Sequence, residues 1–454
     1  MRREIVFLFG ALVALAGCDD GGGGGGGTPE ADMAVQDRGI IRADAAPTDQ
    51  GPPEGDLGPL ADQGAGGAGG AADMGVQPPD LCDRVVGYGL QGVPAAVVDG
   101  APRFAPRAVW TGVEWGVLWQ APVADEPGVN EVMFRRFNSD GQGVGEAVRL
   151  GVAKQPQQEI LFNGTGYVAV WLSTRTRGGG IDGIKVQLLG ADGSPNGEAQ
   201  DVPTTFDVAH MDAAWAPRAG GMVVFTRGMG GVGGLFAVPL DESGSAGPAQ
   251  RLSDSEVRGP AIAFGDGSWG VAWLDRASAN PSDLVFAIIN DRGEIFGMPR
   301  RQVEAGAQSA VYVAYGQGNY GVAWSKVDGM GALAPMLTLY DAAGDNLATP
   351  PVTGPRGLGL VTDVAWLDPD SFGVAWQDNS ASEITVGLTR VNTRGQVQEP
   401  FRLEVEPGRA AQSLHVAGNV SRAGLWFVDD PDPQPGGTFS AEARILGALL
   451  GPCR

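Results

Sequence analysis

The chain has 454 residues, a formal net charge of −22, 74 glycines, three cysteines and two histidines. Such an acidic excess argues against nucleic acid as a partner. Two histidines leave little room for histidine-based catalysis or a multi-histidine metal site, so we expect no cofactor and no metal. Because one hydrophobic core seldom grows to this length, we expect several domains or a repeated architecture.

The N-terminus has the features of an export signal. Arg2 and Arg3 precede an apolar run from Ile5 to Ala16, which is too short to span a bilayer. The run ends in Leu-Ala-Gly before Cys18, a pattern that resembles the bacterial lipobox. The resemblance implies that residues 1–17 are removed and that Cys18 is lipidated, so that its acyl chains anchor the protein in a membrane. The alternative is an ordinary secretory signal followed by a chance cysteine.

We therefore expect an exported protein, lipid-anchored to a bacterial membrane. Asp19 resembles the inner-membrane retention signal of enterobacterial lipoproteins. Sorting rules differ among bacteria, so both membranes stay open, and we favour the outer membrane or cell surface over the inner membrane.

Residues 18–80 have the composition of a tether. From residue 19 onward this segment holds no aromatic residue, twelve acidic residues, two basic residues and the glycine run 21–27. Such a segment cannot bury enough apolar surface to offset the entropy of ordering, so we expect a disordered linker. A solvated spacer fits the composition better than an acidic site for calcium or a basic partner.

The remainder, 81–454, is built from a repeat. Seven segments each end in an aromatic residue; these anchors are Trp119, Trp171, Phe225, Trp273, Trp324, Trp376 and Phe427. Each repeat holds about four strand-sized apolar segments, and in the fourth these are Pro260–Phe264, Trp269–Leu274, Leu284–Asn290 and Pro299–Val303. We predict an all-β fold, a seven-bladed β-propeller of four-stranded antiparallel blades preceded by the linker. A pair of β-sandwiches or a linear array of small β domains is the alternative.

Two further columns of aromatic residues recur in the repeats. The first closes the first strand and reads Trp110, Phe162, Trp215, Phe264, Tyr315, Trp366 and then Ala417. The second begins the second strand and reads Trp115, Tyr167, Gly221, Trp269, Tyr320, Phe372 and Ala423. Recurrence in nearly every repeat favours packing between blades over a sugar-stacking platform, because a binding site need not be copied seven times.

One unit, Ala365-Trp366 followed by Gly373-Val374-Ala375-Trp376, illustrates a family resemblance. It resembles the repeats of secreted and surface-attached propeller proteins of myxobacteria-like organisms, which read Ala-Trp, a glycine turn, then aromatic-x-Val-x-Trp. The resemblance covers about residues 90–454 and implies a tethered lipoprotein with a seven-bladed propeller. It says far more about fold than about function.

The two ends of the domain are expected to meet. The seventh repeat offers three strands, near Leu414–Ala417, Gly424–Val428 and Phe439–Leu446, and its fourth strand looks missing. We predict that the segment Val93–Val98 completes this last blade. Cys82 and Cys453 bracket the domain in an exported chain, so we predict a disulfide between them.

Variable loops between second and third strands are the predicted binding surface, because rigid scaffolds display recognition residues on such loops. The candidate residues there are Arg175, Arg177, Arg227, Asp275, Arg276, Asp378, Asp429 and Asp430. The pair Asp429-Asp430 is read as solvated rather than as a metal site.

Two functions remain open. The first is a non-enzymatic binding or scaffolding module, expected to be a monomer, for an envelope protein or a polysaccharide. The second is a glycan hydrolase or lyase using carboxylates such as Asp275 and Asp378 as acid and base. An enzyme should gather ionisable groups at the ring centre, where the first strands converge. The first strands Ala261–Phe264 and Val311–Ala314 are almost wholly apolar, which favours binding.

Overall fold

A computed structural model describes residues 98–99 and most of residues 106–450. The segments outside the description are 1–97, 100–105, 124–128, 174–182, 218, 228–232, 276–281, 328–332, 353–359, 369, 379–384, 399, 404–409, 420–421, 431–443 and 451–454. The secondary structure of the described part of the chain consists of β-strands, with no helix. None of its segments is a helix long and apolar enough to cross a membrane.

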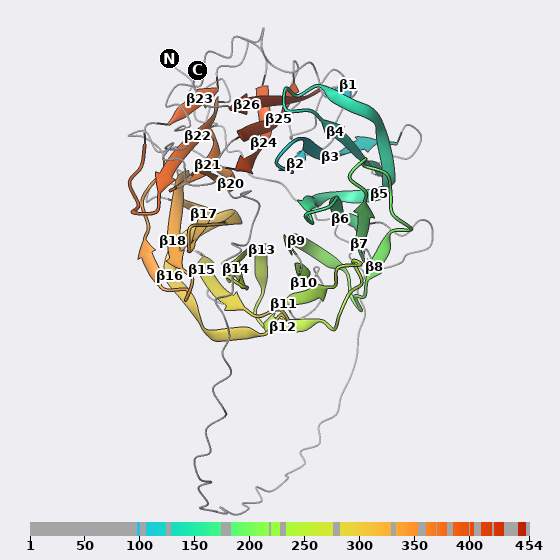
Figure 1. The fold of residues 1–454 in the computed structure, drawn as a ribbon. Helices are drawn as coiled ribbons and strands as arrows, with labels where there is room; N and C mark the ends of the chain where they lie inside the picture. The colour runs from blue at the N-terminus through green and yellow to red at the C-terminus, as the bar shows by residue number, and fades with distance from the viewer. Residues whose placement is uncertain are drawn as a thin grey trace, which may run out of the picture. The chain divides into compact units, whose positions relative to one another are not determined.

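The strands form seven four-stranded antiparallel blades arranged in a ring (Figure 1). Blade one consists of β2 (Arg107–Trp110), β3 (Trp115–Pro122), β4 (Asn130–Phe137) and the first part of β5 (Gly143–Phe162). Blade two consists of the second part of β5, β6 (Tyr167–Ser173), β7 (Gly183–Leu189) and β8 (Gln200–Val202). Blade three consists of β9 (Val208–Ala216), β10 (Gly220–Arg227), β11 (Leu235–Leu240) and β12 (Gln250–Ser253).

Blades four and five share a strand in the same way as blades one and two. Blade four consists of β13 (Val257–Gly265), β14 (Ser268–Asp275), β15 (Ser282–Ile289) and the first part of β16 (Ile295–Gly316). Blade five consists of the second part of β16, β17 (Asn319–Val327), β18 (Leu333–Asp341) and β19 (Asn346–Ala348). Blade six consists of β20 (Leu360–Asp368), β21 (Ser371–Asp378), β22 (Thr385–Asn392) and β23 (Phe401–Leu403).

Blade seven combines strands from both ends of the domain. It consists of β24 (Ala410–Asn419), β25 (Arg422–Asp430), β26 (Arg444–Leu450) and β1 (Val98–Asp99). Val98 pairs with Ile445 and Asp99 with Arg444, which confirms that the N-terminal segment completes the last blade. The predicted disulfide cannot be followed here, because Cys82 and Cys453 lie outside the described residues. The predicted signal sequence, Cys18 and tether also lie outside them.

Glycines explain how one blade packs on the next. A Cβ added to Gly116 would lie 2.4 Å from the ring of Tyr167, which belongs to the following blade. Gly270 and Gly321 receive Tyr320 and Phe372 of their following blades in the same way. The glycine that follows the second-column aromatic in these blades therefore leaves space for the second-column ring of the next blade. This contact confirms the packing role of that column.

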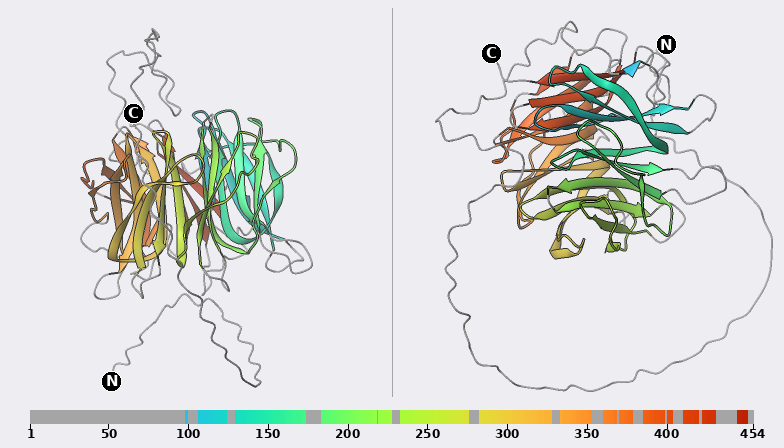
Figure 2. Two further views of the ribbon diagram at one scale, coloured as in Figure 1. Left: turned by 90° about the horizontal axis from the view of Figure 1, so that it is seen from below. Right: turned by 45° about the vertical axis from the view of Figure 1, so that its right-hand side comes forward.

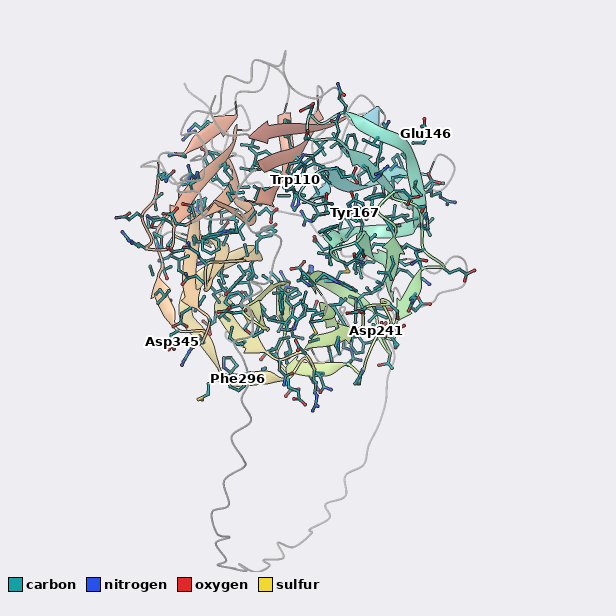
Figure 3. All side chains as sticks on the ribbon, in the orientation of Figure 1. Trp110, Glu146, Tyr167, Asp241, Phe296 and Asp345 are labelled. Carbon is teal, nitrogen blue, oxygen red and sulfur yellow. The ribbon has the colours of Figure 1, made fainter. Side chains whose placement is uncertain are left out.

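The same contact closes the ring. An added Cβ on Gly424 of blade seven would lie 3.0 Å from the Trp115 ring of blade one. Second strands are buried on both faces, as β6 and β14 show, because each is sandwiched between neighbouring blades. Figure 2 shows the blades from the side, and Figure 3 shows Asp241, Phe296 and Asp345 at the outer rim of the ring.

Candidate functional site in the central channel

The first strands of all seven blades surround a cavity of about 720 Å³ at the centre of the ring. These strands are β2, β5, β9, β13, β16, β20 and β24. The cavity size falls in the range of about 300–1,000 Å³ that is typical of small-molecule sites. The innermost strands can be followed around the centre in Figure 1.

Eight ionisable side chains from six strands line this cavity. They are Arg107 (β2), Glu159 (β5), His210 and Asp212 (β9), Tyr312 and Tyr315 (β16), Asp363 (β20) and His415 (β24). The expectation that the first strands are almost wholly apolar is therefore wrong for the ring as a whole. It holds for blade four, whose wall is formed by Pro260, Ile262 and Ala263, and for Val311 and Val313 in blade five.

An ion pair joins the first two blades inside the cavity. Arg107 Nε donates to Glu159 Oε1 over 2.9 Å, and the two side chains are 20% and 18% exposed. Burial would lower the pKa of Arg107, but Glu159, Asp363 and Tyr312 together raise it, so the guanidinium stays charged. Burial raises the pKa of Glu159 above its ordinary value, against the opposing effects of Arg107 and His415.

Asp212 and Asp363 each form a hydrogen bond with a backbone amide of the next blade. Asp212 accepts hydrogen bonds from Ala213 N and from Ile262 N of blade four, each over 2.8 Å. Asp363 accepts from Val364 N over 2.8 Å and from Val416 N of blade seven over 3.0 Å. Both oxygens of each carboxylate are thus used inside the protein.

The two aspartates differ in their charged surroundings. Burial and the Glu159 carboxylate raise the pKa of Asp212 well above its ordinary value, despite its two amide donors. Burial would also raise the pKa of Asp363, but His415, Arg107 and the Val416 amide lower it overall. Asp363 is therefore the carboxylate that is held ionised.

His415 links blades six, seven and one. Its Nε2 lies 3.0 Å from the Ala108 carbonyl oxygen, and its Nδ1 forms an ion pair with Asp363. Because both nitrogens face oxygen acceptors, both contacts are hydrogen bonds only in the imidazolium form. The ring nitrogens are accordingly committed to the protein.

Some polar atoms in the cavity are not committed. Among the described residues, the terminal guanidinium nitrogens of Arg107, Glu159 Oε2 and the Tyr312 hydroxyl have no protein hydrogen-bond partner. Burial and the neighbouring carboxylates raise the pKa of Tyr312 to about 12, so the hydroxyl keeps its proton at neutral pH. Donors and an acceptor are therefore available to a bound molecule.

Aromatic edges line one end of the cavity, beside the tight turns between first and second strands. Phe162, Trp215, Phe264, Tyr315 and Trp366 all line it and are partly exposed. Each also serves packing: an added Cβ on Gly265 would lie 2.0 Å from Tyr315, and one on Gly316 would lie 1.9 Å from Trp366. The first aromatic column thus packs blades and also presents ring edges to the cavity.

None of the predicted loop residues that the structure describes lines this cavity. Arg175, Arg177 and Arg276 fall outside the described residues. Arg227 is exposed and stacks over Phe206 with 5.2 Å between guanidinium carbon and ring centre.

The acidic members of the predicted set occupy strand ends. Asp275 is only 1% exposed, at the end of β14, and pairs in register with Asp283. Asp378 is partly buried at the end of β21. Asp429 and Asp430 end β25, where their backbones pair with Ala411 and Ala410. Within the described part of the chain, no three histidine, cysteine or acidic side chains are placed to hold a metal ion.

Sequence reasoning missed the cavity residues although the repeat contains a signal for them. Arg107, Glu159, Tyr312 and His415 each stand twelve positions before their anchor aromatic, and Asp212 and Asp363 stand thirteen before theirs. Because the residue type changes from blade to blade, the column does not show as a repeated motif.

Comparison with known proteins supports the fold. No protein-family model matches the sequence, and a search of curated proteins gives no match. The solved polysaccharide lyase Uly1 is similar with a TM-score of 0.50 at 10% identity, over 78% of this chain and 91% of that one. The β-propeller domain of the Trilobed protease from Pyrococcus furiosus has a TM-score of 0.47 at 7% identity, over 79% and 97%. The Aleuria aurantia lectin AAL, solved with Fucα1-6GlcNAc, has a TM-score of 0.40 at 13% identity, over 68% and 99%.

The strand pairing, together with the likeness to Uly1, establishes the class of protein: an all-β propeller of four-stranded antiparallel blades. The feature that distinguishes this propeller is the channel, which is lined by ionisable residues from six blades and aromatic edges from five.

Proposed function

We propose that this protein is an exported lipoprotein, anchored through Cys18, whose propeller binds a saccharide in its central channel. The observation that carries the proposal is the cavity with its uncommitted polar atoms on Arg107, Glu159 and Tyr312. A concave site with a few convergent polar groups and shifted pKa values is where a ligand is expected. The disulfide between Cys82 and Cys453 belongs to the same proposal, because it would tie the two chain ends at the closed blade.

A saccharide fits this mixture of groups better than a protein does. Sugar hydroxyls both donate and accept hydrogen bonds, which suits neighbouring arginine and glutamate atoms. The C–H faces of a sugar ring suit apolar and aromatic walls such as Ile262 and Trp215. A cavity of about 720 Å³ admits a short saccharide or a chain end, whereas a folded protein would need an outer face of the ring.

The test is a carbohydrate microarray probed with the full chain in detergent, using wild type, Tyr312→Phe and Arg227→Ala. Tyr312→Phe removes a hydroxyl without a protein partner among the described residues, so the fold should be unchanged. We expect wild type and Arg227→Ala to bind the same saccharides and Tyr312→Phe to bind them more weakly. Loss of binding only with Arg227→Ala would place the site on the loop face, and absence of any binding would overturn the proposal.

A glycan hydrolase or lyase is the second candidate. The observation in its favour is that the ring centre holds the ionisable groups an enzyme requires, with the pKa of Glu159 raised and that of Asp363 lowered. A carboxyl with a raised pKa suits proton donation, and Glu159 Oε2 faces no protein donor among the described residues. Incubation with polysaccharides, followed by assays for new reducing ends and unsaturated products, distinguishes catalysis from binding alone.

A further inference from the structure

The polar wall and the apolar wall of the channel lie on different blades. Arg107, Glu159, Asp363 and His415 come from blades one, two, six and seven, which are consecutive around the ring. Blade four presents Pro260 and contributes no ionisable side chain to the described lining. Blade four therefore offers a ligand hydrocarbon, whereas each of the other six blades brings at least one ionisable side chain to the cavity.

We propose that the ligand of this channel is an electrically neutral saccharide, recognised through hydroxyl groups by the Arg107–Glu159 pair and Tyr312. This inference rests on the proposed saccharide-binding function and specifies its ligand class. The geometry of the pair is the first argument. Arg107 uses Nε for Glu159 Oε1, which leaves its terminal N–H groups and Glu159 Oε2 for a ligand. A hydroxyl can accept from the guanidinium and donate to the carboxylate at once.

The charges around the pair are the second argument. The Arg107 guanidinium is already matched by Glu159 through a direct ion pair, and the His415 ring is in direct contact with Asp363. A ligand carboxylate can only accept hydrogen bonds. It would also lie beside the carboxylates of Glu159 and Asp363, which already contact Arg107 and His415. Placing like charges together in a partly desolvated site weakens binding.

The charge of the whole chain acts in the same direction. A formal net charge of −22 creates a field that slows the approach of polyanions. Within the cavity, Asp212 adds no positive charge that an anion could use, and burial and the nearby Arg258 lower the pKa of the remaining imidazole, His210. A neutral sugar meets none of these penalties, and its C–H face can lie on the apolar wall around Ile262 and Val313.

The experiment is calorimetric titration of the full chain in detergent with matched oligosaccharide pairs. Each pair has the same linkage and length but differs in oxidation at one carbon: gluco- with glucurono-, galacto- with galacturono-, and manno- with mannurono-oligosaccharides. We expect at least one neutral member to bind and its uronate partner to bind about tenfold or more weakly, which is about 1.4 kcal/mol. Equal or tighter binding of the uronate would overturn this inference and leave the proposed function standing. Binding of no saccharide, in this set or on the array, would overturn the proposed function itself.

Two variants test the assigned residues. Glu159→Gln replaces the accepting carboxylate by an amide of the same shape, so neutral-sugar binding should weaken and discrimination against the uronate should shrink. Glu131→Gln is the matched control, because Glu131 pairs with Arg149 on strands β4 and β5 at a more exposed site. Circular dichroism and thermal melting confirm that both variants fold. Unchanged discrimination in a folded Glu159→Gln variant would contradict the assignment.

Discussion

Arg107 Nε lies 2.9 Å from Glu159 Oε1, although the two residues are 52 positions apart in the chain. The separation is one repeat, so the two side chains occupy equivalent places on neighbouring blades. One position of the repeat thus supplies a cation in one blade and its anion in the next. The channel obtains its chemistry from this difference between otherwise similar blades.

Loss of the arginine should destabilise the ring. Arg107→Met leaves Glu159 without its cation in a mostly buried place, so we expect the free energy of unfolding to fall by about 1–3 kcal/mol. Adding Glu159→Gln should restore part of that loss, because the unpaired charge is then gone. Urea unfolding of the two single variants and the double variant measures the coupling. Strictly additive effects would show that the pair contributes nothing to stability.

Asp363 and Asp212 should respond to pH in opposite directions. Asp363 has a lowered pKa, so its ionised form stabilises the fold above its ordinary value of 3.8, and that stability is lost as pH falls below it. Asp212 has a raised pKa, so the fold loses stability as pH rises above 3.8 through its folded value. The penalty of Asp363→Asn should therefore shrink in acid, while that of Asp212→Asn should shrink as pH increases.

Unfolding free energies of these two variants and of wild type, measured across acidic to neutral pH, check this expectation. The two aspartates form a matched pair, since each accepts from its own following amide and from an amide of the next blade. Penalties that change with pH in the same direction would contradict the opposite charge states assigned here.

Gly116, which packs against the ring of Tyr167, should not tolerate a side chain. Gly116→Ala places a methyl group where the ring now lies, and the buried ring cannot move without disturbing its blade, so we expect a loss of about 1–3 kcal/mol. Gly183→Ala is the control, because an added Cβ there meets no described atom within 4 Å. Chemical denaturation should separate the two variants clearly, and equal stability would contradict the packing role of the glycine.

Much of the fold could be predicted from the sequence because packing acts identically in every blade. The residues Gly265-Asp266-Gly267 between two apolar segments indicate a tight turn, and Asp266 and Gly267 have φ of 52° and 74° there. The seventh blade was harder: its third strand was predicted near Phe439–Leu446 and is β26, Arg444–Leu450. Here the repeat lacks two of its three aromatic signals, since Ala417 and Ala423 replace them.

The channel could not be predicted in the same way, because its residues act through differences between blades. The apolar first strands Ala261–Phe264 and Val311–Ala314 belong to blades four and five, and blade four is the one that brings no ionisable side chain to the described lining. Within these two segments, Tyr312 is the one residue with a polar group, its hydroxyl. The aspartate contacts depend on register shifts, such as that between Val361 and Asp363, which sequence spacing does not show.

The membrane anchor is tested independently of the channel. Cys18→Ala should release the protein from the membrane fraction and abolish labelling with a fatty-acid probe, because the acyl chains would have no attachment site. Cell fractionation with metabolic labelling gives the result, and Cys82→Ala serves as the control cysteine that should keep the label. Retention of both membrane association and label in Cys18→Ala would show that the anchor lies elsewhere.

The most direct test of the central claim is the position of a bound oligosaccharide in a crystal structure of the full chain. The ligand should be the tightest neutral binder found by titration. We predict that it occupies the central cavity, with hydroxyl groups on Arg107 and Glu159 and a further contact to the Tyr312 hydroxyl. An oligosaccharide bound on the loop face beside Arg227, with the cavity free of it, would contradict the account.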